Sequence, residues 1–166
     1  MAPLILASSS PRRKQLLEQL GVEFTIFSPD IDETVRHAEP VAAYVKRLAE
    51  EKARVVQQQF PQAIVLAADT SLGLDDQILG KPQSKAHAFE MWSQLSGRKH
   101  QVYSGVCVCT ATQSLSIVVC TEVEFQILSH NDMDRYWATS EPLGKAGAYA
   151  IQGIAAQYIP RIIGSY

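Results

Sequence analysis

Ala63–Thr70, with the sequence AIVLAADT, is the stretch that decides the fold. Its first six residues form a continuous apolar run of strand length, which predicts a central strand covered on both faces. Asp69 closes this run, and Thr70 to Leu74 returns to apolar alternation instead of starting a helix. We therefore expect further strands beside this one and helices over its faces.

The chain before Ala63 supplies two strands and two helices. A strand at Leu4–Ala7 is followed by a helix that begins at the capping signal Ser10-Pro11. Leu16, Leu17 and Leu20 are predicted to form the inner face of this helix, and Val22–Phe27 is predicted to be the next strand. The long helix is expected at Val41–Phe60, where apolar residues recur at helical spacing.

The segment Ser28–Pro40, between the second strand and the long helix, is acidic, contains two prolines and has no clean periodicity. It is therefore predicted to be a loop. The chain after Thr70 adds a helix capped by Ser84 and a second helix capped by Ser129 with Asp132. Strands are expected at Leu72–Leu74, Gln77–Leu79, Gln101–Thr110, Leu115–Ile127 and Gln157–Ile163, the two longest as an antiparallel pair.

The order of these elements predicts an α/β fold with a mixed sheet flanked by helices. A chain of 166 residues fits one domain, or two lobes that share a sheet around a cleft. The net charge of -2 gives no sign of a nucleic-acid or membrane surface. Three cysteines without metal spacing favour a reducing cytoplasm, and no signal peptide or membrane-spanning run is seen. The cysteines are expected in the core.

Arg12, Arg13 and Lys14 lie where a helix dipole disfavours positive charge. The three side chains could simply extend into solvent. Because three cations follow a serine-rich turn whose free amides point the same way, we favour an anion site that a phosphate would fill.

Lys52 falls on the apolar stripe of the long helix, where lysine is rarely buried without a partner. It either reaches solvent or a local carboxylate at the edge of the stripe, or points into a polar cleft. Asp69 could form a turn or cap, but its place at a strand end favours a functional carboxylate. With Asp30, Asp32 and Glu33 of the acidic loop, it offers oxygen ligands for Mg²⁺.

Lys81 follows a glycine that allows close approach of the backbone, and it is a candidate phosphate cation outside any P-loop pattern. Four scattered histidines lack metal-ligand spacing, and the serines of the first turn lack a nucleophile elbow.

Several ordered motifs together strongly resemble the Maf family of nucleoside triphosphate pyrophosphatases, and most closely its dTTP/UTP branch. The motifs cover essentially the whole chain: LILASSSPRRKQLLEQLG, DIDE, RLAEEKA, AADT, LGKP, LSGRKHQVYSGV and EPLGKAGAYAIQG. The resemblance implies an elongated fold with a substrate cleft, like that of inosine triphosphate pyrophosphatases. It also implies a single domain over residues 1–166 and a divalent cation, Mg²⁺ or Mn²⁺, as cofactor.

The resemblance also assigns roles to residues of this sequence. Phosphate binding is implied for Ser8, Arg12, Arg13, Lys52 and Lys81. Asp69 is implied as the proton acceptor and Glu33 as a metal or water-positioning carboxylate, with either carboxylate as a metal ligand. A cytoplasmic house-cleaning hydrolase, without nucleic-acid or membrane partners and with a homodimer as its expected assembly, follows from this picture.

Base selection is implied for Arg12, Thr70 and Gln152. Members resembling 7-methyl-GTP hydrolases tend to carry tryptophan, glutamine and glutamate at these positions. A side-chain amide at Gln152 offers a donor and an acceptor to the imide edge of uracil or thymine, although a glutamine in a glycine-rich turn can also be purely structural.

The family pattern continues past Gly164-Ser165-Tyr166 into a Val-Val-Gly-Leu-Pro segment and a closing helix, which this sequence lacks. We expect exposed apolar surface as a result. The alternatives to dTTP and UTP hydrolysis are a 7-methyl-GTP or other modified-nucleotide pyrophosphatase, and a nucleotide-binding regulator of septum formation. Asp69 favours catalysis over pure binding, because a second negative charge weakens triphosphate binding.

Overall fold

The computed structural model describes residues 2–166, which divide into two compact units. The first unit comprises the chain up to Asp69 together with Ser104–Val118. The second unit comprises Thr70–Tyr103 and Val119–Tyr166. The chain passes between the units within three strands, which are β3 (Ile64–Leu74), β5 (Lys99–Cys109) and β6 (Ser114–Glu124).

The strands form a mixed sheet of order β2-β1-β3-β5-β6-β7, with β4 paired to β3. β1 runs parallel to both β2 and β3, whereas β4 pairs antiparallel with β3 and β7 antiparallel with β6. The predicted mixed α/β architecture is therefore confirmed. The short strands are β1 (Leu4–Leu6), β2 (Thr25–Ile26), β4 (Gln77–Leu79) and β7 (Arg161–Ile163).

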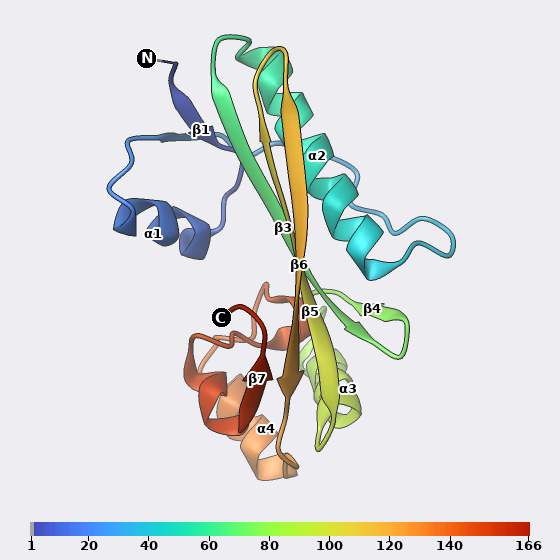
Figure 1. Cartoon of the computed structure of the whole chain (residues 1–166). Coiled ribbons are helices and arrows are strands. Elements are labelled where there is room, and N and C mark those ends of the chain that lie inside the picture. The colour runs from blue at the N-terminus through green and yellow to red at the C-terminus, as the bar shows by residue number, and fades with distance from the viewer. Residues whose placement is uncertain (1) are drawn as a thin grey trace. The chain divides into compact units, whose positions relative to one another are not determined.

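The core of the first unit lies between α2 (Val41–Gln59) and the sheet (Figure 1). Small residues of α2, Ala49 and Ala53, pack there with the β3 residues Val65 and Ala67. This allows the helix to approach the strands closely. At Gly105 of β5, an added Cβ would lie 2.6 Å from the carbonyl carbon of Val45 and 2.9 Å from the amide nitrogen of Lys46.

The second unit is built around α3 (Lys85–Leu95) and α4 (His130–Trp137). Trp92 is buried there, and its indole nitrogen donates to the carbonyl oxygen of Ala148 at 3.1 Å. The 3-10 turns η1 (Ala146–Ala148) and η2 (Ile154–Tyr158) complete this core.

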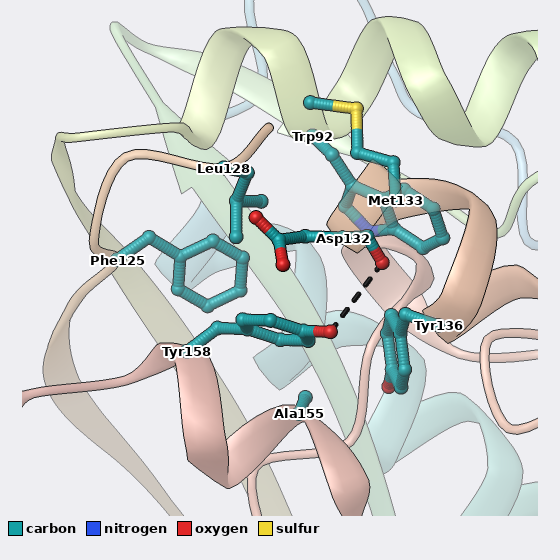
Figure 2. Close-up of a pocket in the computed structure, with 8 residues that line it drawn as sticks. All are labelled: Trp92, Phe125, Leu128, Asp132, Met133, Tyr136, Ala155 and Tyr158. Atoms are coloured by element: carbon teal, nitrogen blue, oxygen red, sulfur yellow. Dashed lines mark hydrogen bonds between the residues drawn. The ribbon is translucent and has the colours of Figure 1, made fainter. Parts of the chain in front are cut away.

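A small cavity remains inside the core of the second unit (Figure 2). Its volume is about 10 Å³, and most of the side chains around it are apolar. The Tyr158 hydroxyl donates across it to the carbonyl oxygen of Asp132 at 3.4 Å. A volume of this size holds at most one water molecule, so the cavity is a packing gap and not a substrate pocket.

The helix start signals are confirmed. Ser10 caps α1 (Pro11–Gln19), Ser84 caps α3 through the amide of His87, and Ser129 forms a capping box with Asp132 at the start of α4. Cys107 and Cys109 are buried, as expected, but Cys120 is exposed, so the expectation is wrong for that cysteine.

Four expectations about the elements are wrong. Leu16 and Leu20 of α1 are 44% and 75% exposed, so only Leu17 forms the inner face of that helix. The strand expected at Val22–Phe27 is limited to β2, since only its end pairs with β1. Gln157–Ile163 is strand only in β7, because η2 takes its first residues. The separate strand expected at Leu72–Leu74 is the continuation of β3 through Asp69.

His100 of β5 is a fully buried titratable residue in the core of the second unit. Its Nε2 lies 2.6 Å from the Tyr149 hydroxyl, and its ring meets that of Phe125 edge-on. Among the described residues no hydrogen-bond partner faces Nδ1. Burial lowers the pKa of His100 to about 4, because the charged ring would lose its hydration.

We expect His100 to make the protein less stable in mild acid. Between its ordinary pKa of 6.5 and about 4, the unfolded chain binds a proton that the folded chain does not bind. The free energy of unfolding should therefore be fully present above pH 6.5 and fall by on the order of 2 kcal/mol by about pH 5. Urea unfolding of the wild type and His100→Gln, above pH 6.5 and at about pH 5, measures this loss of stability. An equal loss of stability in the two proteins would contradict it.

Candidate active site

Ser8 and Arg13 are joined at the start of α1. The Ser8 hydroxyl is buried and accepts hydrogen bonds from the Ser10 amide at 3.2 Å and from Arg13 Nη1 at 3.1 Å. Ser10 in turn accepts from the Arg13 amide at 3.5 Å. The serine-rich turn therefore fixes one of the three cations, whereas Arg12 is exposed and Lys14 forms an exposed ion pair with Glu18.

Lys52 of α2 joins two carboxylates from distant parts of the chain. Its Nζ lies 2.7 Å from Glu33 Oε1 and 2.8 Å from Asp69 Oδ1. The side chains of Lys52 and Asp69 are only 11% and 12% exposed, while that of Glu33 is 45% exposed. The lysine on the apolar stripe is thus held by a partner from the sheet and a partner from the acidic loop.

Asp69 reaches Lys52 because of its position within β3, not because it ends a strand. Side chains alternate between the faces of a strand, so Asp69 shares a face with Val65 and Ala67, which pack against α2. The expectation that Asp69 lies at the carboxyl end of a strand is wrong, since β3 continues to Leu74. The alternation, and not the strand end, directs this carboxylate toward the helix.

Electrostatic interactions connect Arg13 with the two carboxylates that contact Lys52. Burial lowers the pKa of Arg13, and the negative charges of Asp69 and Glu33 oppose this shift. Burial raises the pKa of Tyr44 to about 12, and the same two carboxylates add to the effect. Arg13 therefore lies within electrostatic range of Glu33 and Asp69, the two carboxylates that contact Lys52, and these four residues form a charged cluster in the first unit.

The acidic loop contributes only one of its carboxylates to this cluster. Asp30 and Asp32 are exposed, and Asp32 Oδ1 accepts a hydrogen bond from the Thr34 amide at 2.9 Å. Hydrogen bonds from Thr34 lower the pKa of Asp32. Asp32 thus stabilises a local turn. Among residues 2–166, no three histidine, cysteine, aspartate or glutamate side chains form a group that could hold a metal ion.

Three other predicted site residues belong to the second unit. Lys81 is exposed and follows Gly80, whose carbonyl accepts from the Gly147 amide at 3.0 Å. Thr70 is exposed on β3, and Gln152 is exposed in the turn before η2.

Glu141 holds the turn that carries Gln152. Its carboxylate accepts hydrogen bonds from the Ile154 amide at 2.8 Å, the Ala155 amide at 3.2 Å and the Tyr136 hydroxyl at 2.6 Å. A Cβ at Gly153 would collide with this carboxylate, so a larger residue there would displace the Glu141 side chain from the turn.

The sequence reasoning missed Glu141 and three residues around Glu33. Tyr44 was expected only on the apolar face of the long helix, but its hydroxyl donates to the Glu33 carbonyl at 2.8 Å. Arg47 and Glu39 form a nearly buried ion pair at 2.6 Å. The only signal in the sequence was that Tyr44 and Arg47 lie on the helix that carries Lys52.

Comparison with known proteins agrees with this fold. The model of the family described as Maf-like protein matches residues 3–166. A dTTP/UTP pyrophosphatase from Acinetobacter baylyi is 65% identical over 161 residues, covering 97% of this chain and 88% of that relative. A dTTP/UTP pyrophosphatase from Symbiobacterium thermophilum is 48% identical over 166 residues, covering 100% of this chain and 86% of that relative.

The chain therefore belongs to the Maf-like family. Among solved structures, the Staphylococcus aureus Ham1 protein matches with a TM-score of 0.56 and 12% identity, over 74% of this chain and 71% of that chain. This match agrees with the expected mixed α/β fold. No helix within residues 2–166 has the length and apolar character needed to span a membrane.

Proposed function

We propose that this protein is a nucleoside triphosphate pyrophosphatase that converts dTTP and UTP to the nucleoside monophosphate and pyrophosphate. The observation that carries the proposal is the charged cluster in which Lys52 bridges Glu33 and Asp69 beside Arg13. Relatives named dTTP/UTP pyrophosphatase, similar over nearly their whole length, support the same activity.

The cations of the cluster suit the binding of a triphosphate. Arg13 and Ser8 would hold phosphate oxygens at the start of α1, where the helix dipole favours an anion. Lys52 would neutralise charge that develops as the bond between the α and β phosphates breaks. Arg12 and Lys81 are exposed and would supply further positive charge.

The carboxylates of the cluster suit water activation. Water forms the new bond to phosphorus, pyrophosphate leaves, and Asp69 would accept the proton that the water loses. Glu33 would orient this water.

A divalent cation fits the same two carboxylates. Glu33 and Asp69 converge on Lys52 Nζ and offer the hard oxygen donors that Mg²⁺ or Mn²⁺ prefers, and substrate phosphates and water would complete the ligand set. A bound cation would polarise a phosphoryl oxygen and lower the pKa of a bound water.

Base selection would depend on Arg12, Thr70 and Gln152. The Gln152 amide can donate to and accept from the imide edge of uracil or thymine. Glu141 supports this role, because it fixes the backbone on the carboxyl-terminal side of Gln152.

A panel of canonical and modified nucleoside triphosphates, assayed for pyrophosphate release with Mg²⁺ or Mn²⁺, tests the proposal. We expect dTTP and UTP to be hydrolysed with the highest kcat/KM, and activity to disappear when the metal is chelated. Tight nucleotide binding without turnover by the folded protein would contradict the enzymatic function. Equal rates with guanine and pyrimidine nucleotides would contradict the roles of Arg12, Thr70 and Gln152.

A further inference from the structure

We infer that Tyr44 and Arg47, with Glu39, are positioning residues that hold the Glu33 carboxylate against Lys52 and Asp69. The inference rests on the proposed function, since Glu33 acts there on the water or the metal. It concerns residues 28–40, which connect β2 to α2 without helix or strand. A carboxylate on such a segment loses much of its freedom only if the backbone beside it is fixed.

Two side chains of α2 donate hydrogen bonds to the consecutive backbone carbonyls of Glu33 and Thr34. The Tyr44 hydroxyl donates to the Glu33 carbonyl oxygen at 2.8 Å. Arg47 Nη2 donates to the carbonyl oxygen of the next residue, Thr34, at 3.1 Å. The backbone that carries the Glu33 side chain is therefore fixed to the helix at two adjacent points.

Arg47 is itself fixed by Glu39 at the end of the same loop. The guanidinium donates from Nε to Glu39 Oε1 at 2.6 Å and from Nη2 to Oε2 at 2.7 Å. The two side chains are only 13% and 9% exposed. A two-point pair of this kind fixes both distance and orientation. Glu39 Oε2 also accepts from the Arg36 amide at 3.0 Å, which closes the loop before α2 begins.

The pKa shifts agree with a rigid arrangement of Tyr44, Arg47 and Glu39, which we call the clamp. Hydrogen bonding from Arg47 lowers the pKa of Glu39 to about 2, and the same bond raises the pKa of Arg47. The guanidinium carbon of Arg47 lies 5.5 Å from the centre of the Tyr44 ring, so the two gripping side chains also contact each other.

The clamp and the catalytic lysine share one rigid element. Tyr44, Arg47 and Lys52 all project from α2, and Lys52 Nζ contacts the carboxylate of the residue whose backbone the clamp holds. α2 therefore sets the position of Glu33 relative to Lys52, and through Lys52 relative to Asp69. Small displacements of such groups cost large factors in rate.

Tyr44→Phe and Arg47→Met test the inference, because each removes hydrogen bonds while keeping most of the side-chain volume. We expect each variant to lower kcat for dTTP about 10-fold to 100-fold, as for outer residues that orient catalytic groups, with KM changed less than about 3-fold. Lys46→Met is the matched control. Lys46 lies on the same helix, its side chain is 51% exposed, and among the described residues it pairs with Glu50 and not with Tyr44, Arg47 or Glu39, so kcat should stay unchanged.

A double-mutant cycle with Glu33→Gln separates positioning from general structural damage. If Arg47 acts through Glu33, Arg47→Met should cost little further activity once Glu33 is replaced. An equal loss of kcat in both backgrounds, or wild-type kcat in Tyr44→Phe and Arg47→Met, would overturn the inference.

Amide hydrogen exchange provides a readout that does not need turnover. Residues 28–40 should exchange faster in Tyr44→Phe and Arg47→Met than in the wild type and Lys46→Met, without a matching increase in the core of α2. Unchanged exchange in the loop would overturn the inference. A wild-type protein that hydrolyses no nucleotide would refute the proposed function, and the exchange measurement would still decide whether the clamp exists.

Discussion

Asp69→Asn should lower kcat for dTTP hydrolysis by about 10²-fold to 10⁴-fold, the range found when a positioned acid or base is removed. Asparagine has nearly the same shape but cannot take the proton from the attacking water, and it is a poorer ligand for a divalent cation. Lys52 keeps Glu33 as a partner at 2.7 Å, so the cluster is not left with an unpaired buried cation. Pyrophosphate release measures the rate, and calorimetric titration with dTTP measures binding.

The control for this substitution is Asp75→Asn. Asp75 also forms an ion pair with a cation, Arg98, at 2.7 Å, but it is 66% exposed and has no role in the proposed reaction. We expect the Asp75 variant to have wild-type turnover, and the Asp69 variant to bind dTTP within about 10-fold of the wild type, because removing a negative charge does not oppose triphosphate binding. Turnover by Asp69→Asn within a factor of about ten of the wild type would exclude Asp69 as the proton acceptor.

Gly105→Ala should destabilise the protein by about 2–4 kcal/mol, through overpacking at a site that cannot relax. The new methyl group would overlap the carbonyl oxygen of Val45 and lie 2.6 Å from its carbonyl carbon. These atoms belong to the backbone of α2 and cannot rotate away as a side chain would. Because α2 also carries Tyr44, Arg47 and Lys52, any retreat of the helix should lower turnover as well.

Urea unfolding at neutral pH measures this effect as a shift in midpoint at constant slope. Gly80→Ala is the matched control, since a Cβ added there would meet no atom within 4 Å and the stability should change by less than about 0.5 kcal/mol. Equal free energies of unfolding for the two variants would show that β5 and α2 do not approach as closely as described.

The sequence predicted Asp69 and Lys52 because each breaks a local apolar pattern. Lys52 interrupts the stripe of α2 and Asp69 interrupts the run of β3, and the structure joins them at 2.8 Å. The end of β3 was misplaced because aspartate is common in turns, whereas here Lys52 on α2 pairs with the carboxylate within the strand. Asp69 still pairs with Lys52, although β3 continues past it.

Residues whose role depends on distant backbone could not be predicted. Tyr44, Arg47 and Glu141 act on carbonyl and amide groups, which every residue has, so no pattern of side chains marks their partners. Leu16 and Leu20 show a second limit of prediction. Helical spacing indicates which residues share a face of the helix, but not whether another element covers that face. Prediction was reliable where the signal was local, as in the caps at Ser10, Ser84 and Ser129.

The chain first passes from the first unit to the second within β3, between Asp69 and Thr70. Asp69, proposed for proton transfer, is thus the last residue before this passage, and Thr70, proposed for base selection, is the first residue after it, in the unit that also contains Gln152. For evolution and for engineering, this separates two kinds of change along the chain. Under the proposed function, substitutions at Thr70 or Gln152 would change the accepted nucleobase without altering the carboxylates of the first unit. A substitution at Arg12 in the first unit would affect both phosphate binding and base selection.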